Sequence, residues 1–382
     1  MDLDLSDDQR LFQETTRRFL EKALPMARVR EVIESDDGFD RDVWAQGAEL
    51  GWFSLLVPER HGGGSVSGSP LSDACIVAEE AGRSMLPGPF IPTNIVAAAI
   101  GSDGSDAQRD AYLPGLIGGE VSASWGLAEA NDVWDGAGVE LRADVDPNGG
   151  FLLSGTKVAV QDAAEADVLL IAARSPGGLT QFLVPSRTPG VEISPLQSMD
   201  LARSFATVAF RDVSLPGSAV LGEVDGASDS IERLGDLAAV LVCAETVGAV
   251  DRLYEMTLDY ALARKAFGRS IGSFQAIKHR LADMLVWLES AKAITVAAAH
   301  AVDLDIDRPG TVSVAKSYVS ERSQAIVRDC LQIHGGIGYT WEYDLHLFFR
   351  RVDSNAVLYG DVNHHQDRLA ALIGLDEEGA RA

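Results

Sequence analysis

Two hydrophobic patterns follow one another along the 382 residues, and their order constrains the fold. Residues 1–118 carry apolar side chains at helical spacing. Residues 119–222 carry short β-prone runs separated by Gly, Pro, Asn and Asp, which is typical of a β-barrel or sandwich. Long helical stretches return in residues 223–382. The sequence therefore predicts an α+β fold with an N-terminal helical domain, a middle β domain and a C-terminal helical domain.

Composition narrows the functional class. The net charge of -25 would repel a polyanion, so we expect no nucleic-acid partner. Cys75, Cys243 and Cys330 lie far apart without a CxxC pair, which predicts free thiols in a reducing compartment and no metal site. The apolar runs are too short for a membrane span, and the acidic start resembles no signal or transit peptide. We therefore expect a cytoplasmic protein without membrane insertion.

A basic, glycine-containing segment separates two of the long helical stretches. It reads RKAFG from Arg264 to Gly268 and continues to Phe274 and Gln275. The guanidinium of Arg264 suits bidentate binding of a pyrophosphate, and Gln275 at a helix start suits the polar edge of a cofactor. The alternative is a helix hairpin in which Arg264 only stabilises a helix C-terminus, and spacing alone favours that alternative.

A second segment, QIHGGIGY from Gln332 to Tyr339, has three glycines in four positions. Glycine lets a backbone approach a ligand closely. No strand precedes the segment, so it is not a dinucleotide-binding fingerprint. A glycine stop for the preceding helix explains this segment more simply when it is considered alone.

Glu245 is the third candidate because it lies in the apolar helical stretch from Leu241 to Gly248. Burial there would raise the pKa of its carboxyl group and make it a suitable proton acceptor, which is the role of a catalytic base. A structural glutamate, paired with an arginine or bonded to water, is the alternative that spacing alone favours.

Together, RKAFGRSIGSFQAIKHRLADM and QIHGGIGYTWEYDLHLFFRR resemble the acyl-CoA dehydrogenase superfamily, and the order of helices and strands extends the resemblance over essentially the whole chain. The resemblance implies an FAD enzyme with an N-terminal helical domain (1–118), a middle β-barrel (119–222) and a C-terminal four-helix bundle (223–382). It implies α,β-dehydrogenation of an acyl-CoA of the fatty-acid or sterol side-chain type in β-oxidation. It further implies a tetramer that passes electrons to electron-transfer flavoprotein.

The resemblance assigns one group of residues to the FAD of a neighbouring subunit, and this group is intact. The first motif contributes its arginine, phenylalanine and glutamine, and the second contributes its glutamine and glycine pair. These residues are Arg264, Phe267, Gln275, Gln332, Gly335 and Gly336.

The chain's own half of the flavin site departs from the family. The usual T-E-P-x-x-G-S-D stretch reads here as Leu127–Asp132, without the Pro or the Gly-Ser pair. The usual W-I-T/S segment reads Ala159–Gln161, and the catalytic Glu of Y-E-G is replaced by Gly360. Some relatives place the base on the long helix instead, at a position held here by Ala238, about two turns before Glu245.

Two explanations fit these departures equally well. The chain is one member of an α2β2 enzyme whose homologous partner holds the FAD and the base, or it is a homotetramer that binds FAD through other residues and uses Glu245. A flavin monooxygenase or oxidase on the same fold and a non-catalytic partner subunit stay open. Asp361 is a weaker candidate base, and His364 and His365 are expected at a solvated helix start rather than at a metal.

Overall fold

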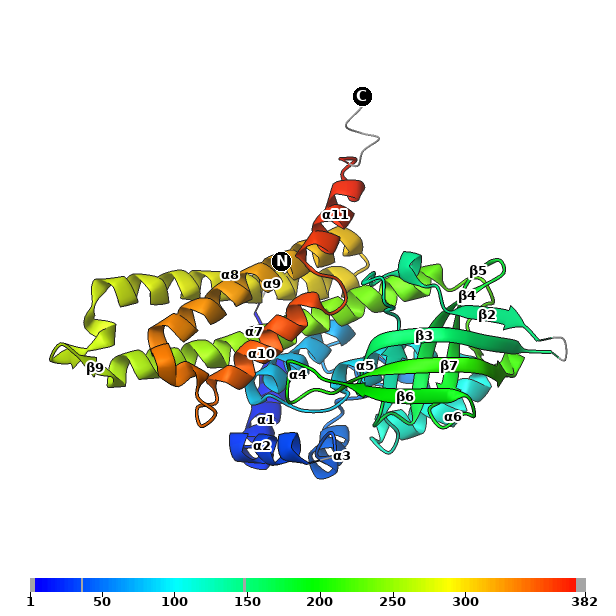
Figure 1. Cartoon of the computed structure of the whole chain (residues 1–382), viewed down its shortest axis with the longest axis horizontal. Helices are drawn as coiled ribbons and strands as arrows, with labels where there is room; N and C mark the ends of the chain where they lie inside the picture. The colour runs from blue at the N-terminus through cyan, green and yellow to red at the C-terminus, as the bar shows by residue number, and fades with distance from the viewer. Residues whose placement is uncertain (1–3, 36, 147–148, 376–382) are drawn as a thin grey trace. The chain divides into compact units, whose positions relative to one another are not determined.

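The computed structural model describes residues 4–35, 37–146 and 149–375, and its elements follow the predicted order (Figure 1). Helices come first: α1 (Asp7–Ala23), α2 (Met26–Glu34), α3 (Arg41–Glu49), α4 (Pro70–Ser84), α5 (Phe90–Asp103) and α6 (Asp106–Ile117). The strands are β1 (Ala123–Gly126), β2 (Arg142–Val145), β3 (Phe151–Gln161), β4 (Val168–Ser175), β5 (Gly178–Pro185), β6 (Val191–Leu196), β7 (Phe205–Leu215) and β8 (Val220–Leu221). The last region holds α7 (Ser228–Ala263), the strands β9 (Lys265–Ala266) and β10 (Arg269–Ser270), α8 (Gln275–Asp303), α9 (Arg308–His334), α10 (Leu345–Val357) and α11 (Val362–Leu372).

The start of α1 shows why the sequence begins this helix where it does. The Ser6 side chain accepts a hydrogen bond from the Gln9 backbone, and the Gln9 side chain accepts one from the Ser6 backbone, at 3.2 and 3.0 Å. This capping box satisfies two N–H groups that have no partner inside a helix. Asp7 and Asp8 place negative charge at the positive end of the helix.

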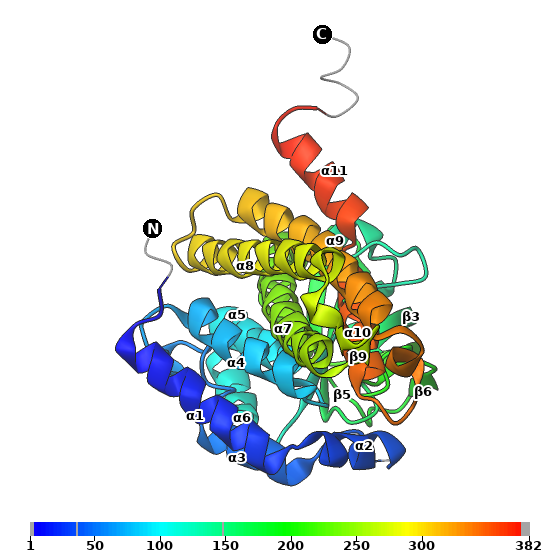
Figure 2. The same ribbon diagram turned by 90° about the vertical axis from the view of Figure 1, so that its left-hand side faces the viewer.

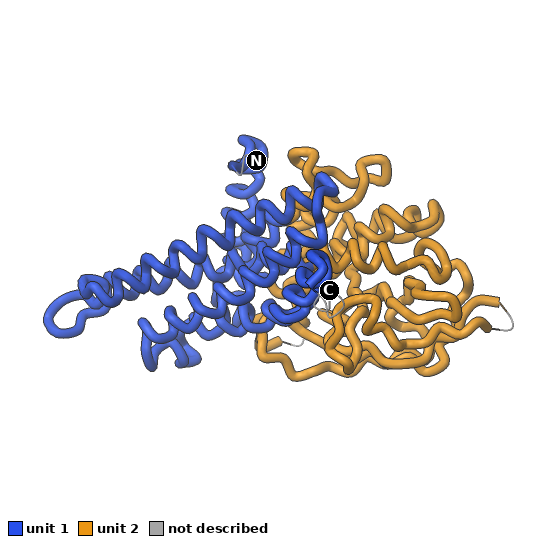
Figure 3. The backbone as a smooth tube through the Cα atoms, turned by 90° about the horizontal axis from the view of Figure 1, so that it is seen from above, with its two compact units in different colours: residues 1–30, 75–86, 239–382 blue, residues 31–74, 87–238 orange. Residues whose placement is uncertain are grey.

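The chain divides into two compact units, each built from separate segments (Figure 3). Unit 1 comprises residues 1–30, 75–86 and 239–382, and unit 2 comprises residues 31–74 and 87–238. The bounds of the three predicted domains stay predictions, because these units follow spatial contacts rather than the order of elements along the chain.

Unit 2 contains the sheet. Its strand order is β6-β7-β3-β2-β4-β5-β8, with β1 parallel to β4. Alternate side chains of these strands form one apolar core around residues such as Leu153, Leu169, Phe182 and Val208. In β3 the register against β7 shifts between Lys157 and Val160, so the strand bulges there.

Unit 1 is helical, with α7, α8 and α9 side by side (Figure 2). Buried side chains at their contact are Cys243 and Val247 from α7, Ala291 from α8 and Val319 from α9. The segment of α4 in this unit crosses α7 at close range. A methyl group on Gly82 would lie 1.9 Å from the Glu245 carbonyl oxygen, and one on Gly248 would lie 1.8 Å from that of Glu79. Only glycine permits this approach.

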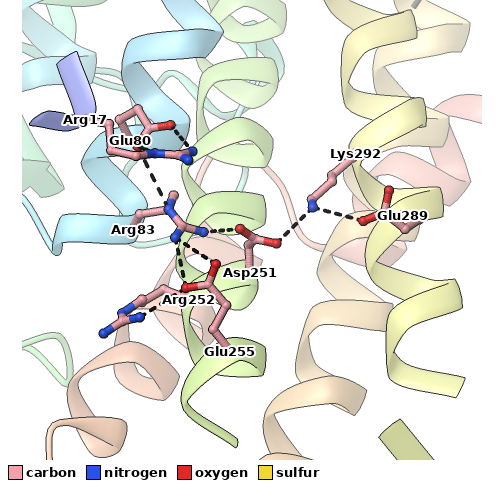
Figure 4. Close-up of polar contacts among 8 residues, drawn as sticks. All are labelled: Arg17, Glu80, Arg83, Asp251, Arg252, Glu255, Glu289 and Lys292. Atoms are coloured by element: carbon pink, nitrogen blue, oxygen red, sulfur yellow. Dashed lines mark hydrogen bonds and ion pairs between the residues drawn. The ribbon is translucent and has the colours of Figure 1, made fainter. Parts of the chain in front are cut away.

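Ion pairs tie the helices of unit 1 together (Figure 4). Arg83 of α4 pairs with Asp251 and Glu255 of α7, and Lys292 of α8 reaches Asp251 at 2.9 Å. Arg17 of α1 forms two hydrogen bonds to Glu80, at 2.6 and 2.9 Å. These cations are therefore already engaged within the chain.

Helix α8 has the length and apolar composition of a membrane-crossing helix, and 33% of its most apolar window is buried inside the structure. A single such helix is weak support for a membrane span, because core helices of soluble proteins have the same properties. Here α8 packs along α9, and the Met284 sulfur of α8 lies 3.8 Å from the Cys330 sulfur of α9.

Candidate functional site

The first candidate segment forms a hairpin at the end of α7. Strands β9 and β10 pair antiparallel and lead into α8, whose first residue is Gln275. The Phe267 side chain is 95% exposed, and its ring lies edge-on to the Phe274 ring with 6.3 Å between centroids. Phe267 also has a φ of 51°, so the turn holds its ring outward in a conformation that non-glycine residues seldom adopt. The hairpin is therefore shaped for contact with something outside the chain.

The hairpin concentrates positive charge in an acidic protein. Arg264, Lys265 and Lys278 are all exposed, and within the described residues none of their side chains has a hydrogen-bonding or ion-pair partner. Gln275 is likewise exposed without a side-chain partner there. A phosphate group could bind these side chains without breaking any internal contact.

The second candidate segment forms a tight turn after α9. Gly335 ends the helix with a φ of 64°, and Gly335 to Tyr339 make a short 3-10 turn. A methyl group added to Gly335 or Gly336 would meet nothing within 4 Å. The glycines therefore leave open space beside an exposed backbone, as close approach of a ligand requires.

The two segments meet at the same end of the helical bundle. The Tyr260 ring, one turn before Arg264, stacks on the His334 ring with 4.4 Å between centroids. His334 directly precedes Gly335. The structure thus brings the segments that contain Arg264 and Gly335 to one end of the bundle, and we call the hairpin and the glycine turn the outward half-site.

The chain's own half-site lies in unit 2, where the segment 127–132 runs beside β3. The Val158 N–H donates to the Ala128 carbonyl at 3.0 Å, so the two segments that depart from the family are neighbours. The fully buried Lys157 ammonium donates to the Glu129 carboxylate at 2.6 Å and to the Leu127 carbonyl at 3.0 Å. Burial lowers the pKa of Lys157 to about 8, against the opposing effect of Glu129. We call this region the inner half-site.

Most other polar groups of the inner half-site are also engaged. The Glu129 carboxylate accepts two backbone N–H groups, from Glu140 and Leu141. The Asn131 amide donates to the Gly138 carbonyl at 2.8 Å. The exception is the Gln161 Oε1 atom, which is buried and has no hydrogen bond among the described residues. It is a single acceptor in a region that otherwise offers little to a ligand.

Glu245 is buried, but its carboxylate is not surrounded by apolar side chains alone. The fully buried Arg351 donates to its Oε1 atom at 2.9 Å, and the Asn355 amide donates to Oε2 at 2.9 Å. The guanidinium stabilises the ionised carboxylate and so offsets the desolvation on which the catalytic assignment relied. Its role as the base stays a prediction, and its surroundings match the structural alternative.

Lys316 extends this network. Its ammonium group is buried and donates to the Asn355 and Ala356 carbonyls at the end of α10, at 2.9 and 3.1 Å. Burial lowers the pKa of Lys316 to about 8. Arg351 is the last residue of the long second motif that carried the resemblance, and Asn355 lies four residues beyond it. Their pairing with Glu245 depends on contacts between distant helices and has no local signal.

The loop at the usual base position is closed to a larger side chain. Gly360 has a φ of 99°, and a methyl group there would lie 2.4 Å from His364 and 2.9 Å from the His365 ring. His365 is buried, hydrogen-bonded to the Tyr359 carbonyl at 3.0 Å, so its expected place at a solvated helix start is wrong. Asp361 caps α11 by accepting the His364 N–H at 2.8 Å.

A pocket of about 270 Å³ in unit 1 does not supply the missing groups. Its lining includes Arg17, Arg83 and Arg252, but each of these arginines is ion-paired within the chain. It therefore offers no unengaged arginine to an anionic ligand.

FAD fits the outward half-site better than the inner one. The outward half-site offers a free guanidinium, exposed amides and an approachable glycine backbone, which are the groups that a dinucleotide's phosphates and polar edges bind. The inner half-site has satisfied nearly all of its polar groups internally. The unengaged groups of the described residues that suit a dinucleotide thus lie in the outward half-site.

Comparison with known proteins decides the family. The description "Acyl-CoA dehydrogenase, N-terminal domain" matches residues 6–120, the middle domain matches residues 124–213 and the C-terminal domain matches residues 226–373. Acyl-CoA dehydrogenase IpdE2 of Mycolicibacterium smegmatis is 31% identical over 97% of this chain and 100% of its own length. The chain belongs to the acyl-CoA dehydrogenase family. It is an oxidoreductase that acts on acyl-CoA.

Solved structures confirm the fold class. The chain is similar to a glutaryl-coenzyme A dehydrogenase in complex with glutaryl-CoA, with a TM-score of 0.90 and 26% identity, over 100% of this chain and 98% of that one. It is also similar to the Tcur3481-Tcur3483 steroid ACAD, with a TM-score of 0.87 and 28% identity, over 98% of this chain and 99% of that one.

Proposed function

We propose that this acyl-CoA dehydrogenase chain takes part in FAD-dependent α,β-dehydrogenation of an acyl-CoA thioester by completing the flavin site of a neighbouring subunit. The observation that carries the proposal is the outward half-site, where Arg264 and Gln275 are exposed without internal partners beside an open glycine backbone. The flavin, when bound, accepts the hydride that leaves the β-carbon.

The chain's own residues have binding roles in this proposal. Arg264 binds the pyrophosphate through two N–H groups, while Gln275 and Gln332 hydrogen-bond polar edges of the cofactor. The Gly335-Gly336 backbone lets the cofactor approach closely. Acyl-CoA is the substrate, electron-transfer flavoprotein the acceptor and the cytoplasm the location. The similarity to a steroid ACAD supports a sterol-derived acyl group as one substrate class.

We further propose that the neighbour is a homologous second chain in an α2β2 assembly. Two features support this. The inner half-site leaves Gln161 Oε1 as its one buried side-chain acceptor without a partner among the described residues, and Gly360 excludes a glutamate at the usual base position. Native mass spectrometry of the assembly purified from its source tests the proposal. We expect a second homologous chain and one FAD for each pair of chains, whereas a homo-oligomer with one FAD per chain would refute it.

The second candidate is a homotetramer in which Glu245 is the base, and its buried carboxylate is the observation in its favour. Glu245→Gln separates the two. A base requires turnover to fall by roughly 100-fold or more with the free energy of unfolding little changed. A structural partner of Arg351 requires the fold to lose about 3–5 kcal/mol, because the buried guanidinium loses its carboxylate. The folded fraction should then turn over within a few-fold of wild type, which is the outcome we expect.

Turnover with an artificial electron acceptor distinguishes dehydrogenase from oxidase or monooxygenase. We expect the assembly to oxidise an acyl-CoA without oxygen when such an acceptor is present. Strict dependence on oxygen would contradict the dehydrogenase proposal and favour a flavin oxidase or monooxygenase on the same fold.

A further inference from the structure

Three aromatic side chains form a cluster at the junction of the two outward segments. The Tyr260 ring lies nearly parallel to the His334 ring, at 21° and 4.4 Å, and the Tyr343 ring lies 5.2 Å from His334 on a tilted plane. The Tyr260 hydroxyl also reaches the His334 carbonyl, at 3.5 Å. His334 is 4% exposed, so its ring is enclosed by these neighbours.

The hydrogen bonds of His334 fix its protonation. Its Nδ1 atom lies 2.9 Å from the Cys330 carbonyl, and a carbonyl only accepts, so Nδ1 carries the proton. Desolvation lowers the pKa of His334, which keeps the ring neutral and leaves Nε2 as an acceptor. The Tyr343 hydroxyl, 3.1 Å away, is therefore the donor to Nε2.

The His334–Tyr343 bond closes the loop that contains the glycine turn. His334 stands immediately before Gly335, and Tyr343 follows the turn, so their hydrogen bond joins both ends of the segment 335–342. The next residue, Asp344, is held by Arg30 at 2.7 Å. The loop is thus clamped at its base, where Gly335 and Gly336 directly follow His334 and stay exposed.

Tyr260 connects this clamp to the basic hairpin. Its carbonyl accepts the Arg264 N–H at 2.8 Å, so the residue that stacks on His334 also sets the last turn of α7 before Arg264. The Arg264 carbonyl also accepts the Ile271 N–H at 2.8 Å, while the Arg264 side chain has no partner within the described residues. The Tyr260–His334 stack is therefore a direct contact between the two segments, next to Arg264 on one side and Gly335 on the other.

We propose that Tyr260, His334 and Tyr343 are positioning residues that hold the Gly335-Gly336 backbone in register with Arg264, so that both bind one flavin nucleotide of a neighbouring subunit. This inference rests on the proposed function. A loop that samples other positions is able to bind the ligand for only a fraction of the time. Its apparent affinity for the ligand falls in proportion to that fraction. Preorganisation by one hydrogen bond should therefore appear as a several-fold effect on FAD affinity.

The experiment measures the dissociation constant of FAD for the deflavinated assembly by quenching of flavin fluorescence. Tyr343→Phe keeps the ring and removes the donor, and His334→Phe keeps the stack and removes both hydrogen bonds. Each should weaken FAD binding by roughly 3- to 10-fold, the scale of one hydrogen bond. The double variant should bind FAD at most about two-fold more weakly than the single variant with the lower FAD affinity, because the two substitutions remove the same hydrogen bond.

Tyr254→Phe is the matched control, because it removes another tyrosine hydroxyl on α7 that bonds the Leu281 carbonyl at 3.3 Å. It should leave FAD affinity within two-fold of wild type. Tyr260→Phe should do the same because it keeps the stacked ring, whereas Tyr260→Leu should weaken binding.

The experiment distinguishes failure of the positioning role from failure of the proposed function. Unchanged FAD affinity in Tyr343→Phe, with or without a lower melting temperature, overturns the positioning role and leaves the proposed function standing. A wild-type assembly that takes up no FAD refutes the proposed function and, with it, this inference. Should His334→Phe fail to fold, the smaller change in Tyr343→Phe still decides the question.

Discussion

The outward and inner half-sites differ in what their polar groups already bind. In the outward half-site, Arg264 and Lys278 are exposed and have no internal partner among the described residues. In the inner half-site, the Lys157 ammonium is fully buried against Glu129 and the Leu127 carbonyl. A charge in water costs little when it is unpaired, but a buried charge must be paired if the chain is to fold.

This difference distinguishes the charged side chains that stabilise the fold from those that remain available to bind a ligand. Lys157 and Glu129 hold a strand and a loop of unit 2 together, and neither can leave its partner for a ligand at low cost. Arg264 contributes nothing comparable to the chain's own fold. A basic side chain therefore stabilises the fold in the inner half-site, whereas in the outward half-site it remains available to bind a ligand.

Lys157→Met should produce the largest change in stability. It leaves the Glu129 carboxylate buried without its cation, although the two backbone N–H groups remain. We expect a loss of about 3–5 kcal/mol in the free energy of unfolding, measured by urea denaturation of the deflavinated protein. Lys278→Met is the control, an exposed lysine without an internal partner, and should change stability by less than about 0.5 kcal/mol. An equal loss in the free energy of unfolding in the two variants would contradict the difference drawn between the two half-sites.

Glu79 sharpens the comparison, because it is largely buried yet has no hydrogen bond among the described residues. Desolvation, with Glu80 and Asp251 nearby, raises its pKa from 4.5 to about 7, against Lys292 and Arg83. The folded state therefore binds this proton more tightly than the unfolded state. Its contribution to stability is complete below pH 4.5 and is lost as the pH rises through 7.

Glu79→Gln should therefore stabilise the fold at pH 8 by about 1–3 kcal/mol and have little effect at pH 5. Urea denaturation at both pH values provides the measurement. Glu14→Gln, on the exposed face of α1, should show no such pH dependence. A stabilisation that is the same at pH 5 and pH 8 would show that Glu79 does not titrate in this range.

Local sequence signals predicted the parts of the fold that local physics determines. Apolar side chains at helical spacing predicted long helices in residues 223–382, where α7, α8 and α9 lie. Helix α5 carries no such periodic signal, because it is apolar on every side and nearly all buried. Strand β6 carries a weak β signal, because it is mostly exposed and contains a proline.

The candidate site divides in the same way. The motifs around Arg264 and Gly335 were found because their residues are adjacent in sequence and unusual together. The partners of Glu245 could not be predicted, because Arg351 and Asn355 come from a helix more than a hundred residues away. Apolar neighbours along one helix do not report what the next helix contributes, so spacing could favour an arginine partner for Glu245 but could not identify Arg351.

The central claim is that Arg264 belongs to a neighbour's flavin and not to this chain's own fold. The most direct measurement is the FAD dissociation constant of the deflavinated assembly carrying Arg264→Ala, together with its melting temperature. We predict about 10- to 100-fold weaker FAD binding, the scale of a charged hydrogen bond, with the melting temperature of the flavin-free protein unchanged. Arg280→Ala breaks an exposed ion pair with Asp329 on the adjacent helices and should leave FAD affinity unaltered. FAD affinity within two-fold of wild type in Arg264→Ala would contradict the account.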